Sequence, residues 1–314
     1  MTDFPKLDVS RLKTRSIHDR KSKVDRSGFA APWKKGGLFS DYLASLPGIL
    51  AADDFISVAD AVAAAVRNDH LVMLGMGGHA IKVGLSPLIV DLMERGVIKL
   101  IAVNGSVMVH DTEVAMVGAT SEDVAASLGD GSFGVTGETN SLINKAARKA
   151  AESGLGLGRA LGLALLEKEF PYNKDSVFAS AARLGIPVTV HMALGTDVYH
   201  IHPEADGAAL GKASLDDFQT FCSAVSQLEK GVYINLGSAV ILPEVFLKAV
   251  TLVRNLGYSL NDITTVNMDF IRHYRPQTNV VSRPTAEGGR GFSLVGHHEL
   301  MFPLLCAAVI ERIA

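Results

Sequence analysis

The chain has 314 residues, of which 48% are hydrophobic and 20% charged, enough for a large buried core. No uninterrupted apolar run reaches the length of a membrane span, so we expect no membrane insertion. The two cysteines, Cys222 and Cys306, have no partner at metal-ligand spacing, and no secretory signal opens the sequence. These features predict a cytoplasmic protein with two buried thiols.

The net charge of −3 is unevenly distributed. Residues 1–35 contain ten Lys or Arg against four Asp, so the rest of the chain is acidic. A basic arm can bind nucleic acid, but this one lacks interleaved aromatic residues, and we do not expect that partner. We expect residues 1–40 to form a solvated arm, or one that packs on the acidic body of a neighbouring subunit. Residues 41–314 are then a single domain.

Five short apolar runs bounded by turn residues predict buried strands, at Leu71–Leu74, Ile98–Val103, Ile186–Val190, Val232–Leu236 and Ile263–Val266. Helical patterns accompany them, at Leu85–Arg95, Ser176–Leu184, Leu215–Glu229, Pro243–Asn255 and Leu300–Ala314. This alternation predicts an α/β fold, a Rossmann-like parallel sheet with helices on both faces. Two Gly-rich segments, Gly129–Gly137 and Gly154–Gly158, predict functional or mobile loops.

The first strand runs into a glycine turn, Gly75-Met76-Gly77-Gly78-His79-Ala80, followed by a helix. Glycines at this position let the backbone approach a pyrophosphate, so the turn predicts a dinucleotide site. The alternative is a tight structural turn. The acidic residue that usually ends the next strand is absent, because that strand ends at Asn104.

The second strand also ends in polar residues, Asn104 and Ser106, followed by His110, Asp111 and Glu113. Ligands bind beyond the carboxyl ends of parallel strands, where these side chains would work as acid, base or cation holder. The alternative is a helix N-cap with acids in the first turn.

Later strand ends carry further candidates. The third strand is followed by Asp197, His200 and His202, and the His-x-His pair would be half of a zinc site in an alternative reading. The fourth is followed by Gly237 and Ser238, with Glu244 in the next helix.

Several segments resemble deoxyhypusine synthase. Ser176–Val188 is similar to that family's helix and "IPV" strand, Asn235–Val240 to its Gly-rich turn, and Phe302–Leu305 to the "FPLL" of its closing helix. The resemblance covers roughly residues 70–310. It implies NAD bound across the strand ends, in part by a neighbouring subunit, and therefore a homodimer or homotetramer. It also places Lys82 and His297 in the cofactor site.

A second resemblance is local. Gly75–Gly84 and the "VHDTE" run within Asn104–Gly118 are similar to the NAD-binding domain of the archaeal-type ornithine cyclodeaminase. The deoxyhypusine synthase pattern itself is incomplete. That family holds its substrate on a lysine near the C-terminus, and here Lys248 is the last lysine. Arg290, which lies in the corresponding region, cannot form the imine.

Together these features predict an NAD-dependent enzyme that acts on a small amine or amino acid but does not make deoxyhypusine. The expected catalytic residues are His110, Asp111, Glu113, Asp197, His200 and Glu244. The expected cofactor residues are Gly75, Gly77, Gly78, His79, Lys82, Asn104, Ser106, Gly237, Ser238 and His297. Two alternatives stay open: a metal-assisted hydrolase or lyase that uses histidines such as His200 and His202, and a non-catalytic nucleotide-binding protein.

Overall fold

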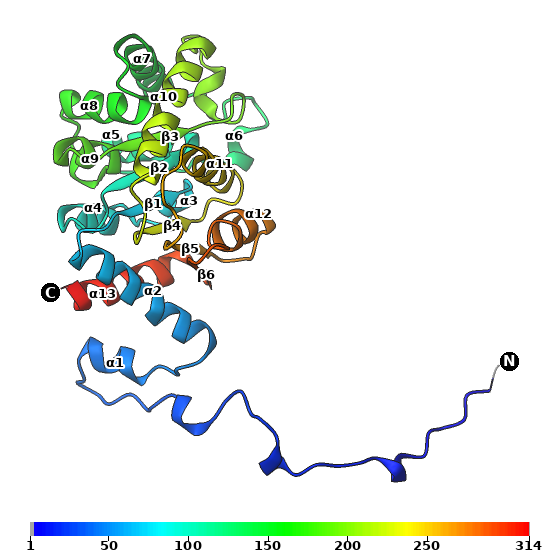
Figure 1. The fold of residues 1–314 in the computed structure, drawn as a ribbon. Helices are drawn as coiled ribbons and strands as arrows, with labels where there is room; N and C mark the ends of the chain where they lie inside the picture. The colour runs from blue at the N-terminus through cyan, green and yellow to red at the C-terminus, as the bar shows by residue number, and fades with distance from the viewer. Residues whose placement is uncertain (1–2, 314) are drawn as a thin grey trace. The chain divides into compact units, whose positions relative to one another are not determined.

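The computed structural model describes residues 3–313 and is drawn as a ribbon in Figure 1. The chain forms two compact units, the first ending at Asp53 and the second beginning at Asp54. The division expected at residue 40 stays a prediction.

The first unit contains little regular structure. Three single 3₁₀ turns each follow an Asp or Ser whose side chain accepts a hydrogen bond from a backbone N–H two residues later, namely Val9–Arg11, Ile17–Asp19 and Arg26–Gly28. One short helix follows, α1 (Phe39–Ser45), and Trp33 packs edge-on against its Tyr42 with the ring centroids 5.8 Å apart.

The second unit is built on one parallel sheet. Its six strands are β1 (Val72–Met76), β2 (Leu100–Asn104), β3 (Val188–His191), β4 (Val232–Leu236), β5 (Thr264–Asp269) and β6 (Arg290–Val295). All neighbouring strands are parallel, and their order is β3-β2-β1-β4-β5-β6. This order confirms the predicted fold class and matches the doubly wound arrangement in which chain connections diverge between the first and fourth strands.

The sixth strand was not predicted from the sequence. It lies at the edge of the sheet, and most of its residues are at least partly exposed, whereas β1 and β5 are buried throughout. An edge strand with Gly291 and Ser293 lacks the continuous apolar run that identifies a central strand.

The helices that accompany the sheet are α2 (Leu50–Arg67), α3 (His79–Lys82), α4 (Ser86–Glu94), α5 (Gly105–Val117), α6 (Val124–Ser127), α7 (Gly137–Ser153), α8 (Leu157–Lys168), α9 (Val177–Leu184), α10 (Gly207–Val225), α11 (Ile241–Asn255), α12 (Tyr274–Pro276) and α13 (His298–Ile313). The connection between β2 and β3 is thus mostly helical. The predicted Gly154–Gly158 loop is a tight turn from α7 into α8, in which Gly154 and Gly156 have positive φ angles.

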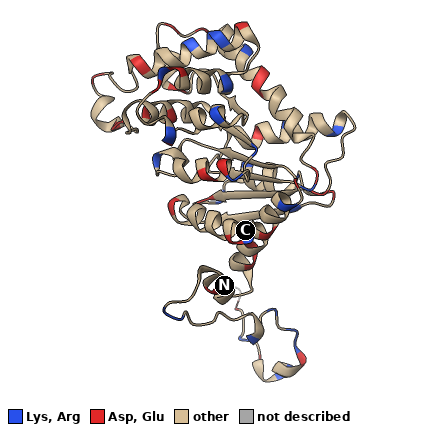
Figure 2. Ribbon diagram, turned by 90° about the vertical axis from the view of Figure 1, so that its left-hand side faces the viewer, with Lys and Arg blue, Asp and Glu red and all other residues tan. Residues whose placement is uncertain are grey.

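Two cores cover opposite faces of the sheet. On one face Met73 and Tyr233 pack against Phe221 of α10 and Phe246 of α11. On the other face side chains from β1 and β4 meet α2, α4 and α13, namely Val72, Leu74, Ile234, Val62, Leu92, Phe302 and Leu305. Figure 2 shows both signs of charge spread over the outer helices, while the strands are mostly free of charged residues. No helix in residues 3–313 is both long and apolar enough to cross a membrane.

Candidate functional site

The turns that follow β1 and β4 touch each other at the carboxyl edge of the sheet. The backbone N–H of Gly77 donates to the carbonyl of Leu236 at 3.0 Å. A Cβ atom on Gly77 would lie 2.7 Å from the carbonyl oxygen of Gly237, so only glycine fits this approach. Gly237 itself has a φ of +67°, and a Cβ there would meet the ring of His298 at 2.5 Å. The two turns therefore pack without side chains between β1 and β4, where the connections diverge and where doubly wound folds bind ligands.

The glycines of the first turn have different roles. Gly75 lies inside β1, where a Cβ would meet the hydroxyl of Tyr233 at 2.3 Å, so its small size serves core packing. Gly78 lies at the start of α3, where a Cβ would be 2.6 Å from Oγ of Ser106 and 3.0 Å from the ring of His110. Gly78 is thus the member of the motif that faces the predicted polar residues.

The helix after the glycine turn differs from the expected one. α3 spans only His79–Lys82, and Gly84 with a φ of +77° separates it from α4. A four-residue helix provides little of the aligned backbone dipole that a long helix directs at a pyrophosphate. The predicted helix Leu85–Arg95 corresponds to α4, and the short α3 between the turn and that helix was not predicted.

A cavity of about 250 Å³ lies beyond the ends of β1, β2 and β3. Five of the predicted site residues line this cavity together with other side chains, namely Lys82, Ser106, His110, Glu113 and Asp197. Asn104 lies beside it as the N-cap of α5, and its Oδ1 accepts a hydrogen bond from Oγ of Ser106 at 2.9 Å. Residues that are far apart in sequence thus share one cavity because parallel strands end at the same edge.

His110 belongs to a chain of hydrogen bonds. Its Nδ1 lies 2.8 Å from Oγ1 of Thr120, and that hydroxyl donates to Oε2 of Glu113 at 2.5 Å. Because the hydroxyl proton goes to Glu113, the Thr120 oxygen is free to accept the Nδ1 proton of His110. Burial alone would raise the pKa of Glu113, but hydrogen bonds with His110 and Thr120 hold it below its usual value. The imidazole is thereby fixed with Nε2 as its remaining acceptor.

Asp111 points elsewhere. Its buried carboxylate accepts hydrogen bonds from the Ser176 hydroxyl at 2.5 Å and from the backbone N–H groups of Val177 at 2.7 Å and Phe178 at 3.1 Å. These are the first N–H groups of α9, which have no partner inside that helix. Asp111 therefore caps a helix, although one distant in sequence rather than its own, and it does not line the cavity with His110.

Asp197 lies against the start of α5. A Cβ on Gly105 would be 2.0 Å from Oδ2 of Asp197, and that oxygen also accepts a hydrogen bond from the Tyr199 hydroxyl at 3.2 Å. Burial raises the pKa of the Asp197 carboxyl group and lowers the pKa of the His200 imidazole, because it disfavours the charged form of each. His200 accepts backbone hydrogen bonds at Nδ1 from Gly195 and Asp197, and its buried Nε2 has no hydrogen-bond partner among residues 3–313.

The His-x-His pair does not converge. His202 accepts the backbone N–H of Glu204 at 3.2 Å, whereas His200 serves the turn before it. Within residues 3–313, no three His, Cys, Asp or Glu side chains gather where they could hold a metal ion. The geometry gives the zinc alternative no support.

The remaining predicted residues lie around the β4 and β5 ends. Ser238 accepts the backbone N–H of Leu242 at 3.2 Å and so helps begin α11. The carboxylate of Glu244, on α11, accepts a hydrogen bond from Nδ2 of Asn279 at 2.9 Å and forms an ion pair with Nε of Arg275 at 3.5 Å. Glu244 does not line the cavity.

Near the start of α13, His298 is buried at the carboxyl edge, whereas the predicted residue His297 is not. His297 is exposed and stacks on Phe270. His298 is buried against Gly237, its ring centroid is 5.3 Å from that of His79, and its Nδ1 has no hydrogen-bond partner in the part of the chain that the structure describes. The sequence contains both histidines, but no pattern in it indicates which one is buried. The choice depends on where α13 begins, and it begins at His298.

Besides His298, sequence reasoning missed Thr120 and Asp217. Asp217 is buried in α10 and accepts the backbone N–H groups of Gly158 at 3.0 Å and Val190 at 2.9 Å. It thus provides a hydrogen-bond acceptor for backbone N–H groups at the start of α8 and on the outer edge of β3. Its position within an otherwise ordinary amphipathic helix gave no motif to recognise.

Comparison with family models and with curated proteins gives no match. Solved structures do resemble the chain. AgrE in a ternary complex with ornithine and NAD⁺ is 14% identical, with a TM-score of 0.54, over 84% of this chain and 34% of that one. A candidate LOR/SDH protein from Methanococcus maripaludis is 16% identical, with a TM-score of 0.50, over 84% of this chain and 70% of that one.

A candidate deoxyhypusine synthase from Entamoeba histolytica is 12% identical, with a TM-score of 0.53, over 90% of this chain and 96% of that one. The chain therefore spans about a third of AgrE and nearly all of the Entamoeba protein. At these identities the likeness concerns the fold, and the chain has the Rossmann-like α/β fold that these proteins share.

Proposed function

We propose that this chain is an NAD-dependent enzyme that acts on a small amine or amino acid. One observation carries the proposal: the side-chain-free contact between the β1 and β4 turns lies at the point where the sheet connections diverge, next to a cavity that contains His110 and Asp197. The reported complex of AgrE with ornithine and NAD⁺ adds support for a ligand of this kind on this fold.

The residues at the carboxyl edge fit a dinucleotide. Because Gly78 and Gly237 have no side chain, the two turns pack closely on Ser106 and His298, and this brings their backbone to the carboxyl edge of the sheet. Two buried ring nitrogens near these ends, Nε2 of His200 and Nδ1 of His298, have no hydrogen bond partner in the described chain. Buried polar atoms are normally paired, so the unpaired ring nitrogen of His298, which lies against Gly237, is consistent with a polar ligand at that turn. Gly77, Gly78, Ser106, Gly237 and Lys82 would hold the cofactor.

NAD, when bound, supplies an acceptor for a hydride from the carbon that bears the substrate nitrogen. His110 is arranged to take a proton from the substrate ammonium, because Thr120 and Glu113 occupy its Nδ1 side and leave Nε2 to act as the base. Asp197 carries a carboxylate at the same cavity and is suited to orient the ammonium group. Deprotonated nitrogen is needed before its lone pair can form the carbon–nitrogen double bond.

The chain is also proposed to be a homodimer or homotetramer, as the deoxyhypusine synthase resemblance implies. The competing hypothesis of a non-catalytic nucleotide-binding protein uses the same turns and differs only in lacking turnover.

The first test is NAD binding. A ligand at 100 times its Kd adds about 2.7 kcal/mol to stability, so thermal unfolding with and without NAD will detect it. Lys82→Gln should weaken binding about tenfold, because Lys82 is an exposed cation at the cavity mouth. Lys149→Gln is the matched control, since Lys149 is exposed on α7 and does not line this cavity. No stabilisation of the wild-type protein at millimolar NAD or NADH would refute the proposal.

The second test is turnover. A panel of small amines and amino acids is incubated with NAD, and reduced nicotinamide is followed by absorbance. His110→Gln should retain NAD binding and lose turnover, because a neutral amide cannot accept the proton. NAD binding without reduction by any amine would favour the non-catalytic hypothesis.

A further inference from the structure

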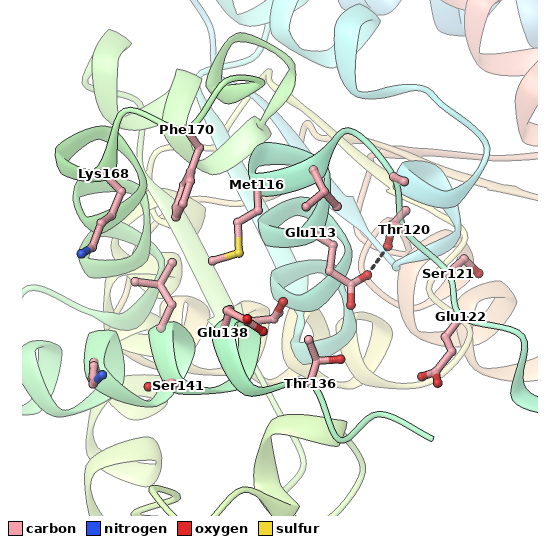
Figure 3. Close-up of a pocket in the computed structure, with 15 residues that line it drawn as sticks. Glu113, Met116, Thr120, Ser121, Glu122, Thr136, Glu138, Ser141, Lys168 and Phe170 are labelled. Carbon is pink, nitrogen blue, oxygen red and sulfur yellow. Dashed lines mark hydrogen bonds between the residues drawn. The ribbon is translucent and has the colours of Figure 1, made fainter. Parts of the chain in front are cut away.

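A second and larger cavity, of about 900 Å³, lies between α5, α7 and the end of α8. Figure 3 shows its lining. It adjoins the cavity at the carboxyl edge, because Glu113, Ser121 and Glu122 line both. No predicted residue other than Glu113 belongs to it, so its chemistry is separate from the cofactor turns.

The middle of this cavity is apolar. Met116 of α5, Leu142 of α7 and Phe170 contribute hydrocarbon, ring and thioether surface. In Figure 3, Met116 and Phe170 extend between Lys168 on one side and Glu113 on the other. A ligand that spans the cavity therefore needs an apolar central part.

One end of the cavity carries carboxylates. Glu113 is half-buried and held ionised by Thr120 and His110, as described above. Glu138 lies in the first turn of α7 and makes no hydrogen bond or ion pair in the described chain. Glu122 lies on the same side, where Oε2 accepts the backbone N–H of Gly134 at 2.8 Å. Three carboxylates with so few cationic partners favour an ammonium ligand.

The other end carries two lysines. Lys145 lies two turns beyond Glu138 on the same face of α7, a separation of about 10 Å at 1.5 Å per residue. Lys168 ends α8, and Figure 3 shows it on the side of the cavity away from Glu122. Lys145 lies 3.9 Å from Glu204, but Arg148 shares that carboxylate at 3.2 Å. A positive end thus faces a negative end across the apolar middle.

We propose that this cavity binds an ω-amino carboxylate, a compound whose ammonium and carboxylate groups stand at opposite ends of an apolar chain. The ammonium lies among Glu113, Glu122 and Glu138, and the carboxylate lies between Lys145 and Lys168. The role of such a compound as the substrate rests on the proposed function, because Glu113 joins this cavity to His110. Binding itself does not require the cofactor.

The test uses four ligands of the same chain length without NAD: ε-aminocaproate, hexamethylenediamine, hexanoate and n-hexylamine. Affinities are measured by isothermal titration. We expect ε-aminocaproate to bind at least about tenfold more tightly than the other three, since it alone satisfies both ends. Equal or tighter binding of the diamine, or no binding of ε-aminocaproate, would overturn the proposal.

Variants separate the two ends. The double variant Lys145→Gln and Lys168→Gln should remove the preference for ε-aminocaproate over n-hexylamine while leaving n-hexylamine binding unchanged. Both lysines are exposed, so the fold should tolerate the change. Glu138→Gln should weaken the binding of both ε-aminocaproate and n-hexylamine. The control Lys149→Gln, on an α7 position outside the cavity, should bind all four ligands like the wild-type protein. An unaltered preference in the double variant contradicts the assignment.

Failure of this inference can be told apart from failure of the proposed function. If NAD binds but ε-aminocaproate does not, the cavity assignment is wrong and the cofactor site stands. If ε-aminocaproate binds with the lysine-dependent preference but NAD does not bind, the cavity assignment stands and the oxidoreductase proposal is wrong.

Discussion

His110 and Asp111 are adjacent on α5, yet their side chains serve different parts of the molecule. His110 bonds with Thr120 at the edge of the cavity, whereas Asp111 accepts three hydrogen bonds from the start of α9. Successive helix positions point about 100° apart, so adjacent residues are separated by the helix itself. Within His110–Glu113, His110 and Glu113 therefore belong to the cavity, whereas Asp111 stabilises the fold. Mutations of the two kinds of residue should have different effects.

Asp111→Ala is expected to destabilise the protein by about 1–3 kcal/mol, because it leaves buried donors of Ser176, Val177 and Phe178 without an acceptor. Denaturant unfolding measures the change. Asp262→Ala is the control, since Asp262 is exposed and its side chain makes no hydrogen bond within the described residues. If Asp111→Ala unfolds like the control, the capping role is wrong.

Two buried carboxyl groups should make stability fall with rising pH. Burial raises the pKa of Asp217 from 3.8 to about 7 and that of Asp111 to about 6, against the opposing effect of their backbone N–H donors. A carboxyl group with a raised folded-state pKa binds its proton more tightly when folded. Its stabilising effect is therefore present at low pH and is lost as pH rises from about 4 to about 7.

Comparison of wild type with Asp217→Asn isolates this effect, because the amide imitates the neutral acid. The stability of wild type relative to the variant should decline across that pH window by about 1.4 kcal/mol for each unit of pKa shift. Unfolding by urea at several pH values gives the slope. Asp262→Asn should follow wild type. Parallel curves for wild type and Asp217→Asn would mean that Asp217 titrates normally.

Two glycines in helices should respond with opposite signs. Gly211 is exposed inside α10 and a Cβ would meet no atom within 4 Å, so Gly211→Ala should add about 0.5–1 kcal/mol by lowering backbone freedom in the unfolded chain. Gly158 lies in the first turn of α8, where a Cβ would be 1.9 Å from the carbonyl oxygen of Val188. Gly158→Ala should cost about 1–3 kcal/mol. Thermal unfolding of both variants checks the signs, and stabilisation by Gly158→Ala would show that β3 and α8 pack less closely than described.

We expect no deoxyhypusine formation. The last lysine, Lys248, is exposed on α11 and pairs with Glu244, so no lysine of the C-terminal region can form the substrate imine. The protein is incubated with NAD, labelled spermidine and a lysine-bearing acceptor protein. Label on the acceptor above that of a protein-free blank would disprove the prediction.

The sequence by itself determined the sheet. Apolar runs of four to six residues gave five of the six strands within a few positions, because a strand buried on both faces must be continuously apolar. It also indicated which residues gather at the carboxyl edge, since parallel strands bring their ends together whatever the details of the helices. Lys82, Ser106, His110, Glu113 and Asp197 share a cavity for that reason.

The tertiary structure decided what each of these side chains does. Gly75 and Gly78 belong to one motif, but one accommodates Tyr233 in the core and the other faces His110. Asp111 became a cap because α9, which begins 66 residues later, presents unpaired N–H groups to it, and Asp217 accepts backbone N–H groups of α8 and β3 in the same way. Buried backbone donors must find an acceptor, and which carboxylate reaches them depends on packing between distant segments that no local pattern encodes.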